Sequence, residues 1–214
     1  MTLWMLVALI ALVLVVVVRR FRGTRLVADD LVGAPLVLTA IGLFQLHSGV
    51  GLDRIGLGDG AWLAGALVLG LALGAVRAAT VRLSSRDGAL LARYTPATLA
   101  VWALSIAGNA GFGMLAAAAG AHPDGRPLQL CIGVGLLGES LVLGMRALST
   151  GLPFSPGTRP GRGAPSRADQ IVDAVRAARP VAPPPDGELT RSPSVRDGVA
   201  WLRGTHTGAQ GGRR

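Results

Sequence analysis

The chain has 214 residues, of which half are hydrophobic and only 15% are charged, whereas an average soluble domain has roughly 25% charged residues. Its formal net charge is nevertheless +9, because 21 arginines oppose 12 acidic residues and no lysine occurs. This composition argues against an ordinary soluble enzyme. The single cysteine, Cys131, excludes an internal disulfide, a CxxC redox pair and a cysteine-based zinc site. The 31 glycines and the missing lysines indicate a high-GC bacterial source.

Five apolar stretches precede residue 150, and each approaches the roughly 17–25 residues that a membrane-spanning helix needs. The predicted spans are residues 2–18, 31–51, 60–78, 96–120 and 128–146. A cleaved signal peptide is the alternative for the first stretch, but no positive charge precedes it and arginines follow it. We therefore predict an all-α membrane protein with a bundle of five transmembrane helices in residues 1–149.

Arginines are distributed unevenly between the predicted loops. The loop after the first span carries four arginines, and the loop after the third span also has four when Arg77 at the end of that span is included. The segment after the fifth span has eleven when Arg146, the last residue of that span, is included. The two remaining loops carry one arginine each. Because arginine-rich loops stay in the cytoplasm, this asymmetry predicts an outside N-terminus, a cytoplasmic C-terminus and a multi-pass protein of the bacterial plasma (inner) membrane.

The loop after the third span has a pattern of its own. Residues 80–83 and 89–94 flank an Asp87-Gly88 pair, which supplies the positive φ that a tight hairpin turn requires. We predict a short cytoplasmic hairpin, with an irregular loop or a continuation of the third span as the alternatives. A lone two-stranded hairpin is marginal in water, so lipid headgroups or neighbouring loops would have to support it.

Residues 150–214 differ in composition from the rest of the chain. They hold nine of the 13 prolines and ten glycines, and few large apolar residues. Such a segment buries too little apolar surface to offset its ordering entropy, so we predict a disordered, Arg/Pro/Gly-rich cytoplasmic tail. Two islands within it, residues 166–179 and 195–203, have apolar side chains at helical spacing. The alternatives for them are membrane-surface or partner-binding helices, and transient helices in a solvated tail.

An ionisable residue inside a membrane span is costly and marks a functional candidate. Glu139 is the only charged residue between Pro127 and Met145, and counting along antiparallel spans places it at the depth of Asn109. We predict that a protonated Glu139 is hydrogen-bonded to Asn109 and ties the fifth span to the fourth. Proton relay or cation binding is the alternative, although no other acid or histidine is expected at that depth.

The sequence contains no recognisable catalytic motif and no metal-binding motif. Gln45 and His47 fall near the outer end of the second span, where we expect interfacial polar residues. A haem held between helices needs axial ligands such as a pair of histidines, but His122 falls in a loop and His206 in the tail. No cofactor is therefore expected, and Cys131 is interpreted as a small packing residue.

Small residues recur at four-residue spacing in two spans. Gly70 and Gly74 form a GxxxG pattern in the third span, and Ala107 and Gly111 continue a small-xxx-small pattern in the fourth. Such spacing lets helix backbones approach closely. These positions predict tight helix packing, either within the chain or between copies in a homo-oligomer.

Several motifs carry a resemblance to a known group of proteins. They are Pro35, Gly74, Arg77, Thr80–Arg82, Asp87–Gly88 and Thr98–Ile106. Together they resemble small actinobacterial membrane proteins similar to the CcdC family, across roughly residues 1–149. The resemblance implies a four- or five-span membrane protein with no established activity. Family members often carry an arginine shortly after the Trp-containing stretch, where this chain has Asn109, and the tail lies outside the resemblance.

These observations favour a non-enzymatic integral membrane protein, an accessory or assembly factor whose partners are the lipid bilayer and another membrane protein or copy. Two alternatives remain open. One is a small transporter or proton-coupled channel that uses Glu139, and the other is a membrane scaffold that recruits a partner through its basic tail. Nucleic acid is not an expected partner, because five acidic residues dilute the tail arginines and only one aromatic residue, Trp201, lies among them.

Overall fold

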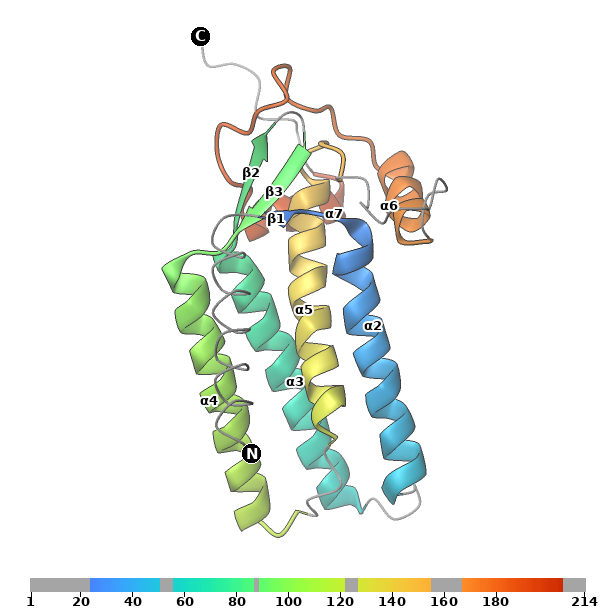
Figure 1. The fold of residues 1–214 in the computed structure, drawn as a ribbon, viewed down its shortest axis with the longest axis vertical. Coiled ribbons are helices and arrows are strands. Elements are labelled where there is room, and N and C mark those ends of the chain that lie inside the picture. The colour runs from blue at the N-terminus through green and yellow to red at the C-terminus, as the bar shows by residue number, and fades with distance from the viewer. Residues whose placement is uncertain (1–23, 51–55, 87–88, 122–126, 155–166, 206–214) are drawn as a thin grey trace, which may run out of the picture.

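The computed structural model describes residues 24–50, 56–86, 89–121, 127–154 and 167–205. Four long helices form its main body, and a small sheet and two further helices lie at one end (Figure 1). The long helices are Ala28–Gln45 (α2, continued by the π-helical η1, Leu46–Val50), Leu57–Thr80 (α3), Pro96–Ala118 (α4) and Leu128–Leu148 (α5). All four are long and apolar enough to cross a membrane, as expected of a membrane protein.

These helices coincide with the second to fifth predicted spans, which confirms that part of the helical fold. The predicted first span, residues 2–18, lies outside the described residues. The start of α4 has a clear local cause. Thr95 and Thr98 form a capping box in which each side chain bonds the other residue's backbone N–H. Pro96 then occupies the first helical position, where no backbone donor is required.

α5 lies between α2 and α3 and packs closely on both (Figure 1). On the α3 side, a Cβ added at Gly74 would overlap the carbonyl oxygen of Gly135, and one at Gly70 would lie 3.4 Å from the Cys131 carbonyl oxygen. On the α2 side, a Cβ at Gly133 would come within 2.6 Å of the Thr39 backbone nitrogen. Glycines therefore set the spacing of α5 from both neighbours.

The sheet has three antiparallel strands in the order β1-β3-β2. They are Thr24–Arg25 (β1), Arg82–Arg86 (β2) and Ala89–Arg93 (β3). The pairing of β2 with β3 confirms the predicted hairpin, although its Asp87-Gly88 turn lies outside the described residues. β1 is a third strand that the sequence did not predict.

An apolar core lies between the sheet and the adjacent helix ends. Leu83, Leu90 and Ala92 project from the strands into this core, which also contains Val81 and Leu143. Leu90 is fully buried. The hairpin is therefore stabilised by contacts with this core and by pairing with β1. An isolated two-stranded hairpin would be only marginally stable in water.

The predicted disorder of the tail is wrong for residues 167–205. This segment contains the helices Arg167–Ala178 (α6) and Val195–Arg203 (α7), so both predicted islands are helical. Composition alone describes the tail as an isolated chain, whereas the segment before α7 forms hydrogen bonds with the sheet. The Leu189 N–H donates to Ser85 Oγ, and the Leu83 N–H donates to Ser192 Oγ. Residues 155–166 and 206–214 lie outside the described part of the chain.

The sheet and α7 lie where α2 and α4 begin and where α3 and α5 end (Figure 1). We call the three strands together with residues 189–203 the polar cap. We call residues 189–205 the C-terminal segment. This segment and the described part of the arginine-rich loop after the third predicted span thus meet at one end of the bundle.

Candidate functional site

A buried ionic cluster joins three elements just below the polar cap. Arg77, in the last turn of α3, donates through Nε and Nη2 to Glu139 Oε2 of α5, at 2.8 and 2.6 Å. The hydroxyl of Tyr94, which follows β3, donates to Glu139 Oε1 at 2.8 Å. Arg77 and Glu139 are each only 8% exposed. The cluster therefore fastens α5 to the end of α3 and to the chain entering α4.

The predicted pairing of Glu139 with Asn109 is wrong. The Asn109 side-chain amide donates instead to the carbonyl oxygen of Ser105, one turn earlier on α4, at 2.8 Å. A guanidinium offers a carboxylate two charge-assisted hydrogen bonds, which are stronger than a bond from a neutral carboxamide. Glu139 thus has a basic partner inside the bundle, which the prediction of a protonated carboxyl did not include.

The energetics of this cluster favour a role in specifying helix contacts. Removing two charges from a polar medium costs about as much as their attraction and hydrogen bonds return, so a buried ion pair adds little net stability. Leaving either partner alone in the apolar interior is much more costly. Arg77 and Glu139 therefore select one arrangement of α3 against α5.

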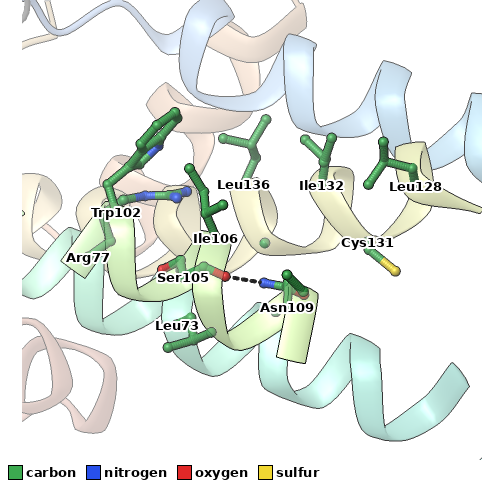
Figure 2. A pocket seen from close by; sticks show the side chains of 14 residues that line it. Leu73, Arg77, Trp102, Ser105, Ile106, Asn109, Leu128, Cys131, Ile132 and Leu136 are labelled. Atoms are coloured by element: carbon green, nitrogen blue, oxygen red, sulfur yellow. Dashed lines mark hydrogen bonds between the residues drawn. The ribbon is translucent and has the colours of Figure 1, made fainter. Parts of the chain in front are cut away.

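A cavity of about 610 Å³ lies beside the cluster, between α3, α4 and α5. Its volume falls within the roughly 300–1,000 Å³ of small-molecule sites. Figure 2 shows Arg77 and Trp102 near one end, and Asn109 and Cys131 toward the other. The remaining lining residues are mostly apolar or glycine, and Glu139 is not among the described residues that line it. The cavity therefore has apolar walls and one charged group, at the cap end.

A second buried arginine organises the polar cap. Arg146, 3% exposed near the end of α5, donates to the carbonyl oxygens of Ala78, Val81 and Pro193. Its Nη2 also donates to Ser192 Oγ at 3.2 Å. One guanidinium thus joins α5, the end of α3 and the C-terminal segment.

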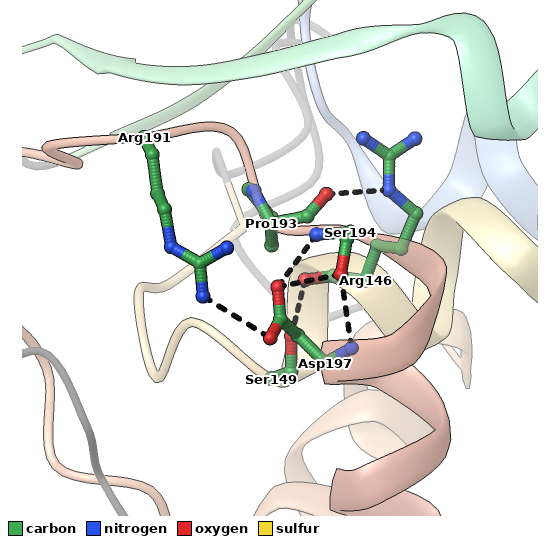
Figure 3. A network of polar contacts seen from close by, with 6 residues as sticks. All are labelled: Arg146, Ser149, Arg191, Pro193, Ser194 and Asp197. Carbon is green, nitrogen blue, oxygen red and sulfur yellow. Dashed lines mark hydrogen bonds and ion pairs between the residues drawn. The ribbon is translucent and has the colours of Figure 1, made fainter.

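The start of α7 lies against this arginine (Figure 3). A Cβ added at Gly198 would lie 3.2 Å from the Arg146 backbone nitrogen, so a glycine permits the close approach of α7 to α5. Asp197 caps α7 by accepting hydrogen bonds from the Ser194 backbone N–H and hydroxyl, and it pairs with Arg191. Burial alone would raise the pKa of Asp197, but these hydrogen bonds and the Arg191 charge outweigh it and hold the pKa below its ordinary value.

The other residues singled out from the sequence are not gathered into this site. Gln45 and His47 are exposed at the far end of the bundle. Ala107 is exposed, and a Cβ at Gly111 would meet no atom within 4 Å, so these small residues of α4 pack on no described helix. Within the described ranges, no three histidine, cysteine or acidic side chains are placed to hold a metal ion.

Comparisons with protein-family models, with curated proteins and with solved structures found no match to this chain. The candidate site therefore stands on its own geometry.

Sequence reasoning missed Arg77, Tyr94 and Arg146 as site residues. A usable signal existed for the first, because an acid inside a span requires a base, and Arg77 is the only arginine inside the predicted spans that precede the fifth. Arg146, at the last position of the predicted fifth span, has no local signal. Its acceptors are backbone carbonyl groups up to 68 residues away, which no side-chain pattern reveals.

Proposed function

We propose that this chain is a five-span, non-enzymatic protein of the bacterial plasma membrane, with its N-terminus outside and its polar cap in the cytoplasm. It serves as an accessory protein or scaffold that presents the cap to a partner protein. The orientation is supported by the arginine asymmetry. The described arginine-rich segments lie at the same end of the bundle (Figure 1), as one shared side of the membrane requires.

The bonding of Arg146 is the observation that carries the scaffold proposal. A guanidinium buried at the end of α5 holds the C-terminal segment through Pro193 and Ser192. Because desolvating a guanidinium without acceptors is costly, loss of this segment would leave Arg146 under-bonded. The segment is therefore an integral part of the cap, and the cap presents a defined surface.

The charge of that surface suggests the chemistry of the partner. Arg82 and Arg86 on β2 and Arg196 on α7 are exposed, so the cap offers several cations at fixed positions. Complementary charge guides association and selects the partner. We therefore expect an acidic cytoplasmic protein surface as the partner.

The transporter hypothesis receives less support. Both carboxylate oxygens of Glu139 accept hydrogen bonds from protein side chains, and the Arg77 cation bound to one of them opposes the binding of a second cation. The cavity beside it is mostly apolar and ends at Arg77, which would repel cations.

Topology reporters test the membrane arrangement. Fusions after Asp59 and Ala121 should be active outside the membrane, and fusions after Arg22, Arg86 and Gly163 should be active in the cytoplasm. A fusion after Gly163 that is active only outside would contradict the five-span orientation.

Site-specific photocrosslinking tests the scaffold role. A photoreactive residue at Arg86 or Arg196 should capture the same partner protein in living cells, because both positions lie on the cap. The matched control is Leu115, which is exposed on α4 in the spanning region. Capture at the cap positions should be lost when Arg146→Leu is added. Capture that persists with the C-terminal segment released would contradict a role for the ordered cap.

A further inference from the structure

The helix α6 is held at the level where the spanning helices end. It lies outside the four long helices at the cap end of the bundle, beside the start of α2 (Figure 1). Its Ala168 is buried, and Arg176 Nη2 donates to the Leu152 carbonyl oxygen at 2.8 Å. The same guanidinium lies 5.8 Å from the centre of the Phe154 ring. Because Leu152 is four residues past the end of α5, these contacts fix α6 at the boundary of the predicted span.

One side of α6 is apolar and exposed. Ile171 and Val175 are 58% and 37% exposed, and Ala174 and Ala178 are also exposed. Side chains three, four and seven positions apart lie on the same side of a helix, so these four residues form what we call the apolar stripe. In water the stripe gains nothing from burial, whereas an amphipathic helix beside a bilayer buries such a stripe at the headgroup boundary.

The opposite side of α6 is polar. At 3.6 residues per turn, Asp173 lies about 160° around the helix from Ile171, and its side chain is 69% exposed. Arg167, by contrast, is exposed on the side of the apolar stripe, four residues before Ile171. An arginine there can reach lipid phosphates while its stem contacts apolar groups, but anionic headgroups would repel a carboxylate. The charges and the apolar side chains therefore indicate the same membrane-facing side of α6.

Lipid is the occupant that the surroundings of α6 favour. The neighbouring helix α2 exposes the large apolar side chains of Leu36 and Val37, which suits a helix bordered by lipid. Since α6 contacts the outside of the bundle at α2 (Figure 1), lipid headgroups surround the end of α2 directly beside α6 when the bundle spans a membrane. The apolar stripe then needs no further protein to cover it.

We propose that α6 is an interfacial helix whose apolar stripe contacts the lipid headgroup region around the cap end of α2. The inference rests on the proposed spanning arrangement, but it holds for either orientation of the bundle. A stripe of this size binds a bilayer weakly by itself, but α6 is joined to the bundle, so its effective concentration at the membrane is high. Arg179, directly after α6, donates to the Trp201 carbonyl oxygen at 3.0 Å. Lipid contact at α6 therefore also positions α7.

Nitroxide accessibility in a bilayer tests this placement. Single cysteines carrying a nitroxide are introduced into the full-length Cys131→Ser protein, which is reconstituted in vesicles of phosphatidylcholine and phosphatidylglycerol. Ile171 and Val175 are the probe positions, and Asp173 and Ala177 are matched controls on the other side of α6. All four are exposed, so the labels displace no packed side chain. The ratio of collisions with oxygen, which concentrates in lipid, to collisions with a water-soluble nickel chelate should be several-fold higher at the probe positions.

A label at Val37, exposed on α2, reports separately whether the bundle spans the bilayer. If Val37 is in lipid while Ile171 and Val175 are as open to the nickel chelate as Asp173, the apolar stripe faces water and the proposal is wrong. Protection of both probe positions from both reagents would assign the stripe to a second copy of the chain. Equal lipid exposure at all four positions of α6 would contradict an amphipathic orientation. Water accessibility at Val37 would contradict the proposed spanning arrangement, and this inference with it.

Discussion

Arg77 and Arg146 are two buried arginines near the same end of the bundle, and they are satisfied in different ways. Arg77 binds one carboxylate and forms a nearly self-contained ion pair with Glu139. Arg146 binds backbone carbonyls and a hydroxyl from two separated segments, residues 78–81 and 192–193. The first arrangement depends on the identity of one other side chain. The second arrangement depends on the positions of backbone groups that are far apart in the sequence. The hydrogen bonds of Arg146 are therefore complete only when the cap is assembled.

The largest effect is expected from breaking the ion pair. Arg77→Leu leaves Glu139 buried without its cation, and removing one partner of a buried pair costs about 3–5 kcal/mol. The free energy of unfolding in mixed micelles should fall by that amount. The double variant Arg77→Leu/Glu139→Leu should recover much of the loss, because no lone charge remains. A double variant whose loss equals the sum of the losses of Arg77→Leu and Glu139→Leu would show that the pair is not coupled.

The second effect concerns Arg146→Leu. Several carbonyl groups would lose a charged donor, at a cost of about 2 kcal/mol, and the loss should appear first in the C-terminal segment. Limited proteolysis should then cut residues 189–205 faster, while the bundle remains protected. Arg196→Leu is the matched control, since Arg196 is an exposed arginine of α7. Cleavage that is accelerated equally in both variants would argue against a specific role of Arg146.

A smaller effect is expected from Tyr94→Phe, which removes one hydrogen bond to Glu139 and keeps the ring. The expected loss is about 1 kcal/mol in the free energy of unfolding. In an Arg77→Leu/Glu139→Leu background the same change should be nearly neutral, since its acceptor is absent. An undiminished effect there would assign the stabilising role of Tyr94 to contacts other than Glu139.

The smallest effect is a pH dependence at the α7 cap. The pKa of Asp197 is lowered in the folded protein, so its contribution to stability is present above the unfolded value of about 3.9 and is lost as pH falls through the folded value. Amide exchange in the first turn of α7, corrected for intrinsic rates, should therefore accelerate between pH 5 and pH 3. Asp197→Asn should remove this acceleration. An identical pH profile in both proteins would contradict the role of the carboxylate.

The spanning helices were predictable because their signal is local. Residues 31–51, 60–78, 96–120 and 128–146 are apolar stretches, and the observed helices differ from them by a few residues at the ends. The hairpin was predictable for a related reason, since Asp87-Gly88 marks a turn from sequence neighbours alone. The count of five spans and the orientation stay predictions.

The candidate site was only partly predictable, because its contacts are non-local. Glu139 was identified from the cost of a charge in a span, but the choice of Asn109 assumed that adjacent antiparallel spans touch at equal depth. In the structure the cavity separates α4 from α5, and Arg77 of α3 binds Glu139 in place of Asn109. The ordered structure of residues 167–205 was missed because composition describes a segment in isolation. It contains no information on long-range contacts such as the hydrogen bond from Arg146 to the Pro193 carbonyl oxygen.

The Arg146 contacts also imply an order of assembly during synthesis. Ala78 and Val81 are translated before Arg146, so two of its acceptors are available as soon as α5 emerges. Pro193 follows Arg146 by 47 residues, so the guanidinium stays incompletely bonded until that later segment has been made. A chain truncated before Pro193 would therefore display an open cationic end on an otherwise finished bundle. Such a chemical difference between complete and incomplete molecules is what a cellular quality-control protease could recognise.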